Sequence, residues 1–327
     1  MSERGATIRR WRPTPPGFLR IALVSLTGLL LIIPSGALVR LTDSGLGCPD
    51  WPGCHGEVVP PLSGHAWIEY SNRIFSGLVV VGAVAAWVAA LRLADASRRL
   101  RRWAAVPALA GLAQGPLGGL TVVFDLHPLL VASHFLLSIV ALGGGTMLAL
   151  AARDHLSGRS RGLDRGRAGL AGCAAGALAG VIVTGVLVTA AGPHSGDPKV
   201  IRRLGNLADA AAIHVRVVIG FCVLAAALGI WLVRSRPRDP LTLRLGILFV
   251  PLLALQIGLG EYQYRHHLPW GVILAHVTVA GALLCCGVAI AWLAARPWTV
   301  AHDPAPSAPD LPQAFADVTA ARHTSST

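Results

Sequence analysis

The sequence predicts an all-α integral membrane protein with eight transmembrane helices, arranged as two pseudo-symmetric four-helix bundles with both termini in the cytoplasm. Three observations predict this fold: the balance of apolar and charged residues, a series of long apolar runs, and an internal repeat. Of the 327 residues, 54% are hydrophobic and 13% are charged. A soluble domain needs more charge to cover its surface, so the composition favours lipid as the surrounding solvent.

Eight apolar runs in the chain are each long enough, at about 20 residues, to cross a hydrocarbon core of about 30 Å. Many contain glycine, which favours close packing of helices in lipid. Four prolines, Pro34, Pro107, Pro116 and Pro251, are expected near helix ends or at kinks. The runs are Phe18–Arg40, Ala66–Leu91, Trp103–Phe124, Pro128–Ala151, Ala168–Ala191, Ala208–Val233, Leu243–Tyr264 and Pro269–Ala294.

Arginines set the expected orientation of these helices. They gather at the N-terminus and in the second, fourth and sixth loops, within residues 4–12, 98–102, 153–167 and 234–244. Short loops rich in arginine stay on the cytoplasmic side, so both termini lie inside and the odd-numbered loops face outward. The net charge of +12 therefore reflects topology, and we expect membrane lipid around the protein and no nucleic-acid partner.

An internal repeat divides the chain into two halves. Five residues recur as the same residue type 142 positions later: Gln114, Leu117, Gly118, Leu126 and His134 match Gln256, Leu259, Gly260, Leu268 and His276. This constant offset indicates a duplication with four helices per half, which gives parallel repeats. We expect an N-terminal arm (1–17), a first half (18–152), a cytoplasmic linker (153–167), a second half (168–295) and a disordered cytoplasmic tail (296–327).

Two histidines lie inside spans of the second half. His214 and His276 are each expected about 10 Å from the outer end of their helices, at matching depth. Ionisable side chains within a span are costly and are functional candidates. Two imidazoles at one depth in a helix bundle can ligate a haem iron from both sides, and we prefer this interpretation. The alternative is a pair of histidines that serve helix packing.

The first half carries only part of the same arrangement. His134 repeats the position of His276, but Asn72 falls opposite His214, and an asparagine is a poor ligand for iron. A pocket with one imidazole leaves the second face of an iron open, which suits a substrate haem or a catalytic haem. The alternative is a vestigial site that has lost a ligand. Two further histidines are candidates to replace the missing ligand, His65 and His127.

Charged residues flank Asn72. Glu69 lies one turn before it, where the repeat places Ala211, and the carboxylate can accept a proton or stabilise positive charge. The alternative is a solvated acid in the first turn of a helix. Arg73 and Arg216 occupy similar places in the two halves. They can pair with haem propionates or extend to the membrane interface.

Two cysteines in the first outward loop flank the segment PDWPG. Cys48 and Cys54 face the oxidising side of the membrane, and their spacing allows a disulfide in a small ring. Such a bridge can be structural or redox-active, and two free thiols are the alternative. The cysteines within the spans are interpreted as small apolar packing residues.

Four motifs in the sequence resemble the haem A synthase family of bacteria. They are GALVRLTDSGLGCPDWPGCHG (36–56), HAWIEYSNR (65–73), QGPLGGLT (114–121) and LPWG (268–271). The resemblance extends from about residue 18 to residue 295, and the first motif is highly specific. One position departs from the family pattern, because many members have histidine where this chain has Asn72.

The resemblance implies a plasma-membrane enzyme that oxidises the C8 methyl group of haem O, its substrate, to a formyl group. The product is haem A for cytochrome c oxidase. The resemblance implies that His214 and His276 bind a haem b. It also implies that His134 and Glu69 belong to the substrate pocket, and that Cys48 and Cys54 form a disulfide near that pocket. Haem O synthase, a farnesyltransferase, is then a candidate partner. The electron donor is left unidentified, and a homo-oligomer stays open.

Two other functions compete with this one. A membrane cytochrome b that only transfers electrons is expected to have two balanced bis-histidine sites, and the Glu69 and Asn72 positions argue against it. A transporter would use broken helices with an ion site at the midplane. The sequence has no acid at that depth.

Overall fold

The computed structural model describes residues 11–59, 64–159, 161–237 and 239–298. In these segments eight helices are long and apolar enough to cross a membrane, which confirms the predicted all-helical fold with eight spans. The helices are α1 (Pro15–Leu41), α2 (Gly64–Arg92), α3 (Arg98–Val123), α4 (Pro128–Ser157), α5 (Arg165–Ala191), α6 (Leu207–Ser235), α7 (Pro240–Arg265) and α8 (Trp270–Ala295).

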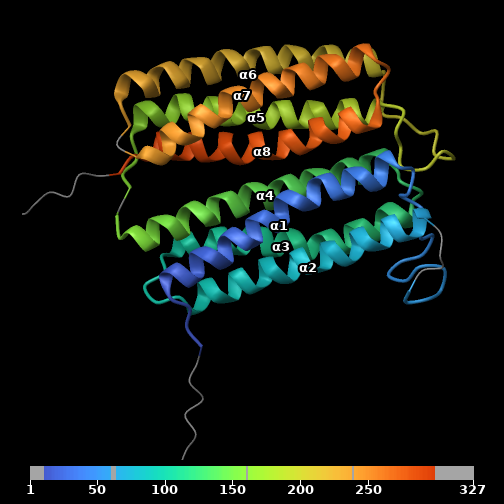
Figure 1. Ribbon diagram of the computed structural model, residues 1–327, viewed down its shortest axis with the longest axis horizontal. Coiled ribbons are helices and arrows are strands. Elements are labelled where there is room, and N and C mark those ends of the chain that lie inside the picture. The colour runs from blue at the N-terminus through green and yellow to red at the C-terminus, as the bar shows by residue number, and fades with distance from the viewer. Residues whose placement is uncertain (1–10, 60–63, 160, 238, 299–327) are drawn as a thin grey trace, which may run out of the picture.

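The helices form two groups that lie side by side, α1 to α4 and α5 to α8 (Figure 1). In the first group α1 packs on α2 and α4, and α3 packs on the same two helices. In the second group α5 packs on α6 and α8, and α7 packs on α8. The groups meet where α8 contacts α1 and α4, and where α4 contacts α5.

Two helices extend well beyond the apolar runs that predicted them. Helix α3 begins at Arg98, before the expected Trp103, and α4 continues to Ser157, past the expected Ala151. Both extensions lie at the arginine-rich end, where arginine favours helix and can reach into the interface. The hydroxyl of Ser97 caps α3 by accepting the Leu100 N–H at 3.1 Å. The four prolines named above lie inside α1, α3 and α7.

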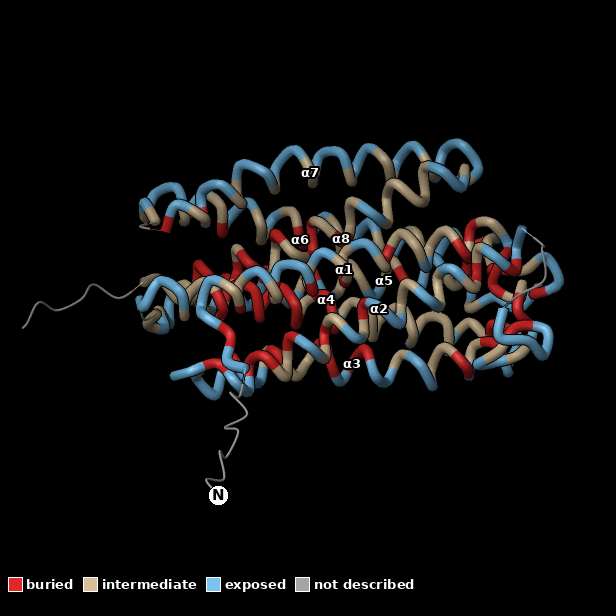
Figure 2. Tube along the Cα trace, turned by 60° about the horizontal axis from the view of Figure 1, so that its bottom comes forward, coloured by how far each residue is buried: buried red, intermediate tan, exposed pale blue. Residues whose placement is uncertain are grey.

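The buried core runs across both groups of helices. One cluster joins Leu29 of α1 and Leu142 of α4 to Leu178 of α5 and Leu284 of α8. Small residues allow the close approach, since a Cβ on Gly281 would lie 3.1 Å from Leu30 Cδ1. Helix α7 is the least covered element, as its mostly exposed trace in Figure 2 shows. An apolar helix in this position is expected to face lipid.

An ion network joins the two groups at their arginine-rich end. Asp239, which caps α7, accepts two hydrogen bonds from Arg153 of α4 at 2.8 and 2.9 Å and one from Arg161 at 2.6 Å. Arg161 also bonds Asp154 at 2.7 Å, and the ring of Trp298 lies 4.9 Å from its guanidinium carbon. Burial alone would raise the pKa of Asp239, but the hydrogen bonds from the two arginines outweigh it and lower the pKa to about 2.

We expect Asp239→Asn to lower the free energy of unfolding by about 1–3 kcal/mol, because it leaves two arginines without their shared carboxylate. A carboxylate with a lowered pKa stabilises the folded state above its unfolded value of about 4. This contribution is lost as the pH falls toward about 2. Thermal unfolding in detergent as a function of pH measures both effects. Asp164→Asn is the matched control, since its ion pair with Arg167 is more exposed; equal losses in the two variants would contradict this role of Asp239.

Candidate functional site

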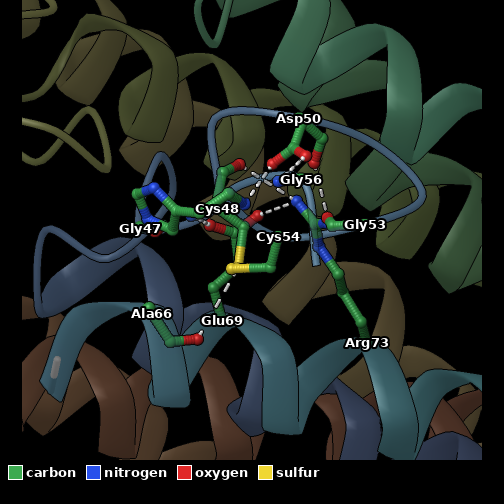
Figure 3. The surroundings of a disulfide bond; sticks show 10 residues. Gly47, Cys48, Asp50, Gly53, Cys54, Gly56, Ala66, Glu69 and Arg73 are labelled. Atoms are coloured by element: carbon green, nitrogen blue, oxygen red, sulfur yellow. Dashed lines mark hydrogen bonds and ion pairs between the residues drawn. A yellow bond between two sulfur atoms is a disulfide. The ribbon is translucent and has the colours of Figure 1, made fainter. Parts of the chain in front are cut away.

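The loop between α1 and α2, described over residues 42–59 and called here the disulfide loop, lies at the end of the bundle away from the arginine-rich loops (Figure 1). Cys48 and Cys54 are joined by a disulfide and are fully buried, which confirms the predicted pairing. Figure 3 shows the bridge lying over the first turns of α2. The loop approaches that helix closely, since a Cβ on Gly47 would lie 2.5 Å from the carbonyl oxygen of His65.

Glu69 of α2 is buried beneath the disulfide loop, with 5% of its surface exposed. Its Oε2 accepts the backbone N–H of Cys48 at 2.8 Å, and its Oε1 pairs with Arg73 Nη2 at 2.6 Å. These contacts rule out the alternative of a solvated first-turn acid. A buried carboxylate with two strong donors instead holds the disulfide in a fixed place over the first half.

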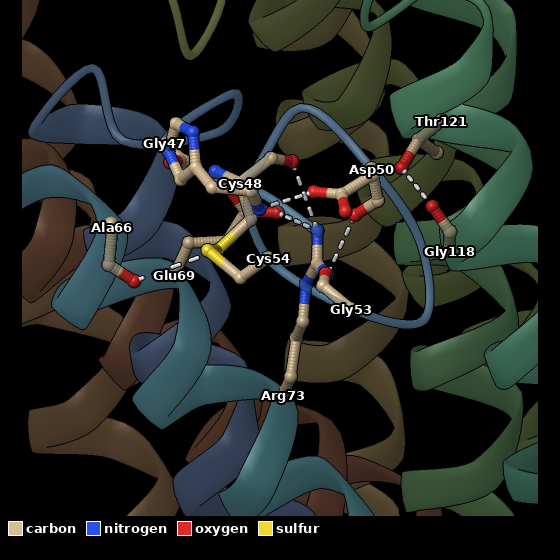
Figure 4. A network of polar contacts seen from close by, with 11 residues as sticks. Gly47, Cys48, Asp50, Gly53, Cys54, Ala66, Glu69, Arg73, Gly118 and Thr121 are labelled. Atoms are coloured by element: carbon tan, nitrogen blue, oxygen red, sulfur yellow. Dashed lines mark hydrogen bonds and ion pairs between the residues drawn. A yellow bond between two sulfur atoms is a disulfide. The ribbon is translucent and has the colours of Figure 1, made fainter. Parts of the chain in front are cut away.

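Arg73, one turn after Glu69 on α2, also binds the disulfide loop. Its guanidinium donates to the carbonyl oxygens of Cys48 at 3.2 Å, Asp50 at 3.0 Å and Gly53 at 2.7 Å (Figure 4). Neither sequence-based interpretation of Arg73 included this role, because backbone carbonyl acceptors leave no pattern in a sequence. Within the loop, the Gly56 and His55 amides donate to the Asp50 carboxylate, and these bonds lower the pKa of Asp50.

The disulfide loop also reaches α3. A Cβ on Gly119 would lie 2.9 Å from the indole of Trp51, so the tryptophan rests directly on the helix backbone. The preceding residue, Gly118, lies beside His134, since a Cβ on Gly118 would lie 3.2 Å from His134 Cε1. The loop therefore spans the end of the first group of helices, from Glu69 on α2 to Gly119 on α3, next to the glycine that lies beside His134.

His134 lies on α4, and its Nδ1 atom is buried without a partner among the described residues. Gln114 of α3 donates to the His134 carbonyl at 3.0 Å and to Ser138 Oγ at 2.6 Å. The counterpart of Ser138 in the second half is Ala280. There the matching glutamine lacks that hydroxyl and contacts the histidine ring instead.

In the second half, His276 of α8 repeats the glycine contact, since a Cβ on Gly260 would lie 3.2 Å from its Cε1. Gln256 Nε2 lies 2.9 Å from His276 Nε2. His214 of α6 shares a hydrogen bond of 2.9 Å with Thr184 Oγ1.

The remaining predicted residues occupy distinct settings. Asn72 Oδ1 accepts a hydrogen bond of 2.9 Å from Ser35 Oγ of α1. Arg216 is exposed and makes no hydrogen bond or ion pair with another described residue. His65 lies beside Ser44, with Nδ1 3.0 Å from the hydroxyl, and His127 precedes α4 as its capping residue.

These residues fit a porphyrin better than a free metal ion. The described part of the chain has no group of three or more histidine, cysteine, aspartate or glutamate side chains that could hold such an ion. His134, His214 and His276 each have a glycine of a neighbouring helix against the ring, and an imidazole in such a setting suits an iron whose other ligands come from a porphyrin. Buried polar atoms without partners, His134 Nδ1, His276 Nδ1, Gln114 Oε1 and Gln256 Oε1, also mark these places as incomplete.

The structure reveals a further element of the repeat that the sequence analysis missed. Ser35 and Gly36 of α1 stand in the same relation to Asn72 as Thr184 and Gly185 of α5 stand to His214. The offset between these helices is 149 (184 − 35), not 142 (214 − 72). The outer loops of the two halves differ in length, and a search at one fixed offset cannot align both helices.

Comparisons with known proteins agree with the motifs. The sequence profile of the COX15-CtaA family, described as a cytochrome oxidase assembly protein, matches residues 19–67 and 62–288. A protein of Shewanella oneidensis named heme A synthase is 29% identical over 323 residues, covering 83% of this chain and 94% of that protein. Heme A synthases of Bacillus pumilus and Halalkalibacterium halodurans are 33% and 37% identical, over 43% and 41% of their lengths and 40% and 37% of this chain.

Proposed function

The chain belongs to the COX15-CtaA family of cytochrome oxidase assembly proteins, and from this premise we propose that it is a haem A synthase. The family assignment confirms the resemblance found in the motifs. In this proposal the substrate is haem O, and the reaction oxidises its C8 methyl group to a formyl group to supply haem A to cytochrome c oxidase. The reaction takes place in the first half, at the outer side of a plasma membrane, with both termini in the cytoplasm.

The observation that carries the proposal is the contrast between the two halves at equivalent places. The second half has His214 and Ala211, whereas the first half has Asn72 and a buried Glu69 under a disulfide. A chain that only relayed electrons would have no use for this difference. Chemistry on a methyl group, in contrast, requires a group that handles protons next to the substrate.

The residues of the first half have separate tasks in this proposal. His134 holds the iron of haem O from α4, with Gly118 leaving room beside the ring. Glu69 receives the proton released as the methyl group is oxidised. Arg73 is a positioning residue, since it keeps the disulfide loop and the carboxylate in place. The loop itself excludes water from the mouth of the site.

The second half supports this reaction with a resident cofactor. We propose that His214 and His276 hold a haem b, and that Thr184 fixes the orientation of the His214 ring through its hydrogen bond. Arg216 remains available for a propionate. When bound, the haem b supplies electron transfer between an external donor or acceptor and the first half.

Extraction and mass analysis of the bound haem test the proposed function. The full chain is expressed together with a haem O source and purified in detergent. We expect haem A in the extract, because the chain converts the substrate that it binds. Haem B alone would instead favour the electron-transfer cytochrome, and a preparation without haem would favour a transporter. Either of these results would contradict the proposal.

A further inference from the structure

The first half contains a polar pair, Ser35 and Asn72, that corresponds to the pair Thr184 and His214 in the second half. The first-half pair has an asparagine where the second-half pair has a histidine. Ser35 Oγ donates to Asn72 Oδ1 at 2.9 Å, and in the second half Thr184 Oγ1 meets His214 Nδ1 at the same distance. The hydroxyl of each pair comes from the first helix of its half, directly before a glycine. The two pairs are therefore the same structural feature, built once around an amide and once around an imidazole.

Gly185 and Gly36, which follow the two hydroxyl residues, show how histidine and asparagine differ in the volume that they fill beside the helix. A Cβ on Gly185 would lie 3.2 Å from the ring of His214, so the imidazole fills the volume beside that helix. A Cβ on Gly36, its counterpart, would have no atom within 4 Å. The first half therefore has no ring against Gly36 of α1, where the second half has the ring of His214 against Gly185 of α5.

The side chain amide of Asn72 can donate a hydrogen bond to a ligand bound beside it. The hydroxyl of Ser35 occupies Asn72 Oδ1, the only atom of the side chain that could approach iron as a donor of electrons. The Asn72 Nδ2 group donates no hydrogen bond to another described residue. The side chain thus offers an N–H donor to whatever lies beside it.

We propose that the Asn72 side of the first-half site binds a small diatomic molecule of the dioxygen type on the haem iron opposite His134. The Asn72 Nδ2 amide donates a hydrogen bond to this molecule, and Ser35 fixes the amide in the required orientation. The inference rests on the proposed function, because it assumes a haem held by His134. It adds to that function an open coordination position, which the second half lacks because His214 fills it.

Carbon monoxide binding to the dithionite-reduced full chain, loaded with haem in both halves, tests the inference. We expect half of the bound haem to bind carbon monoxide, because His214 and His276 block the other half. Asn72→His should restore the missing ring and remove this binding while the haem content stays unchanged. His214→Asn is the matched variant, and it should create carbon monoxide binding in the second half.

The vibrational frequency of the bound carbon monoxide tests the hydrogen bond. Asn72→Leu removes the N–H donor at similar volume, so carbon monoxide should still bind, and its C–O stretch should move to higher frequency. An unchanged stretch would overturn the role of the amide. The absence of carbon monoxide binding to the wild-type chain, or unchanged binding in Asn72→His, would overturn the inference itself.

The same preparations separate this inference from the proposed function. Haem extraction reports whether haem O has become haem A, independently of carbon monoxide. A chain that forms haem A but binds no carbon monoxide overturns only the open position opposite His134. A chain that binds carbon monoxide but leaves haem O unchanged overturns only the proposed function.

Discussion

Glu69→Gln is expected to lower haem A formation by about 10²–10⁴-fold, which is the usual contribution of a general acid or base. The carboxylate lies buried under the disulfide loop with Cys48 and Arg73 as its partners. A glutamine retains an oxygen that can accept the Cys48 amide but cannot take up a proton. The rate of haem A formation, measured by mass analysis of extracted haem, reports the loss, while the spectrum of the second-half haem b should stay unchanged.

A matched variant separates proton transfer from support of the loop. Arg73→Gln removes the ion pair and the clamp on the loop carbonyls, but it leaves the Glu69 carboxylate in place. We expect a smaller loss than in Glu69→Gln, together with a lower thermal stability of the loop region. If Glu69→Gln turned over normally, Glu69 would have no part in the mechanism.

His276→Ala is expected to remove the low-spin haem b signal of the second half. The imidazole lies inside the bundle between α7 and α8, and no other histidine lies within one turn of it on α8. Without it the iron has at most the single ligand of His214, so the bis-histidine spectrum cannot form. The absorption and electron paramagnetic resonance spectra of the purified chain measure this loss.

The exposed His266 supplies the control for this prediction. It stacks on Tyr262 near the outer end of α7, with 4.0 Å between the ring centroids, and lies away from the bundle interior. His266→Ala should therefore leave both spectra unchanged. A low-spin signal that survives His276→Ala would show that the second half does not use this imidazole.

The apolar runs alone predict the eight helices, because a span in lipid needs about 20 apolar residues and internal hydrogen bonds. They misplace the helix ends at the arginine-rich side, as at Arg98, because the helix continues after the apolar stretch ends. The histidines are predictable for a similar reason. An imidazole within a span is rare enough to be noticed without any knowledge of its neighbours.

Contacts between distant segments could not be predicted in this way. Arg73 binds backbone carbonyls of the disulfide loop, and every residue type offers such a carbonyl. Asp239 meets Arg153 and Arg161 only after two helical groups have packed together. The position of Trp51 on Gly119 likewise depends on how the loop folds over α3, which no spacing in the sequence specifies.

The positions of the two haem irons are tested most directly by a structure of the haem-loaded chain in lipid. Anomalous scattering or cryo-electron microscopy density would locate the irons. We predict one iron coordinated by both His214 and His276, and a second beside His134 with Asn72 across from it. Imidazoles turned outward to lipid, with no porphyrin enclosed by either group of helices, would contradict the assignment of both sites.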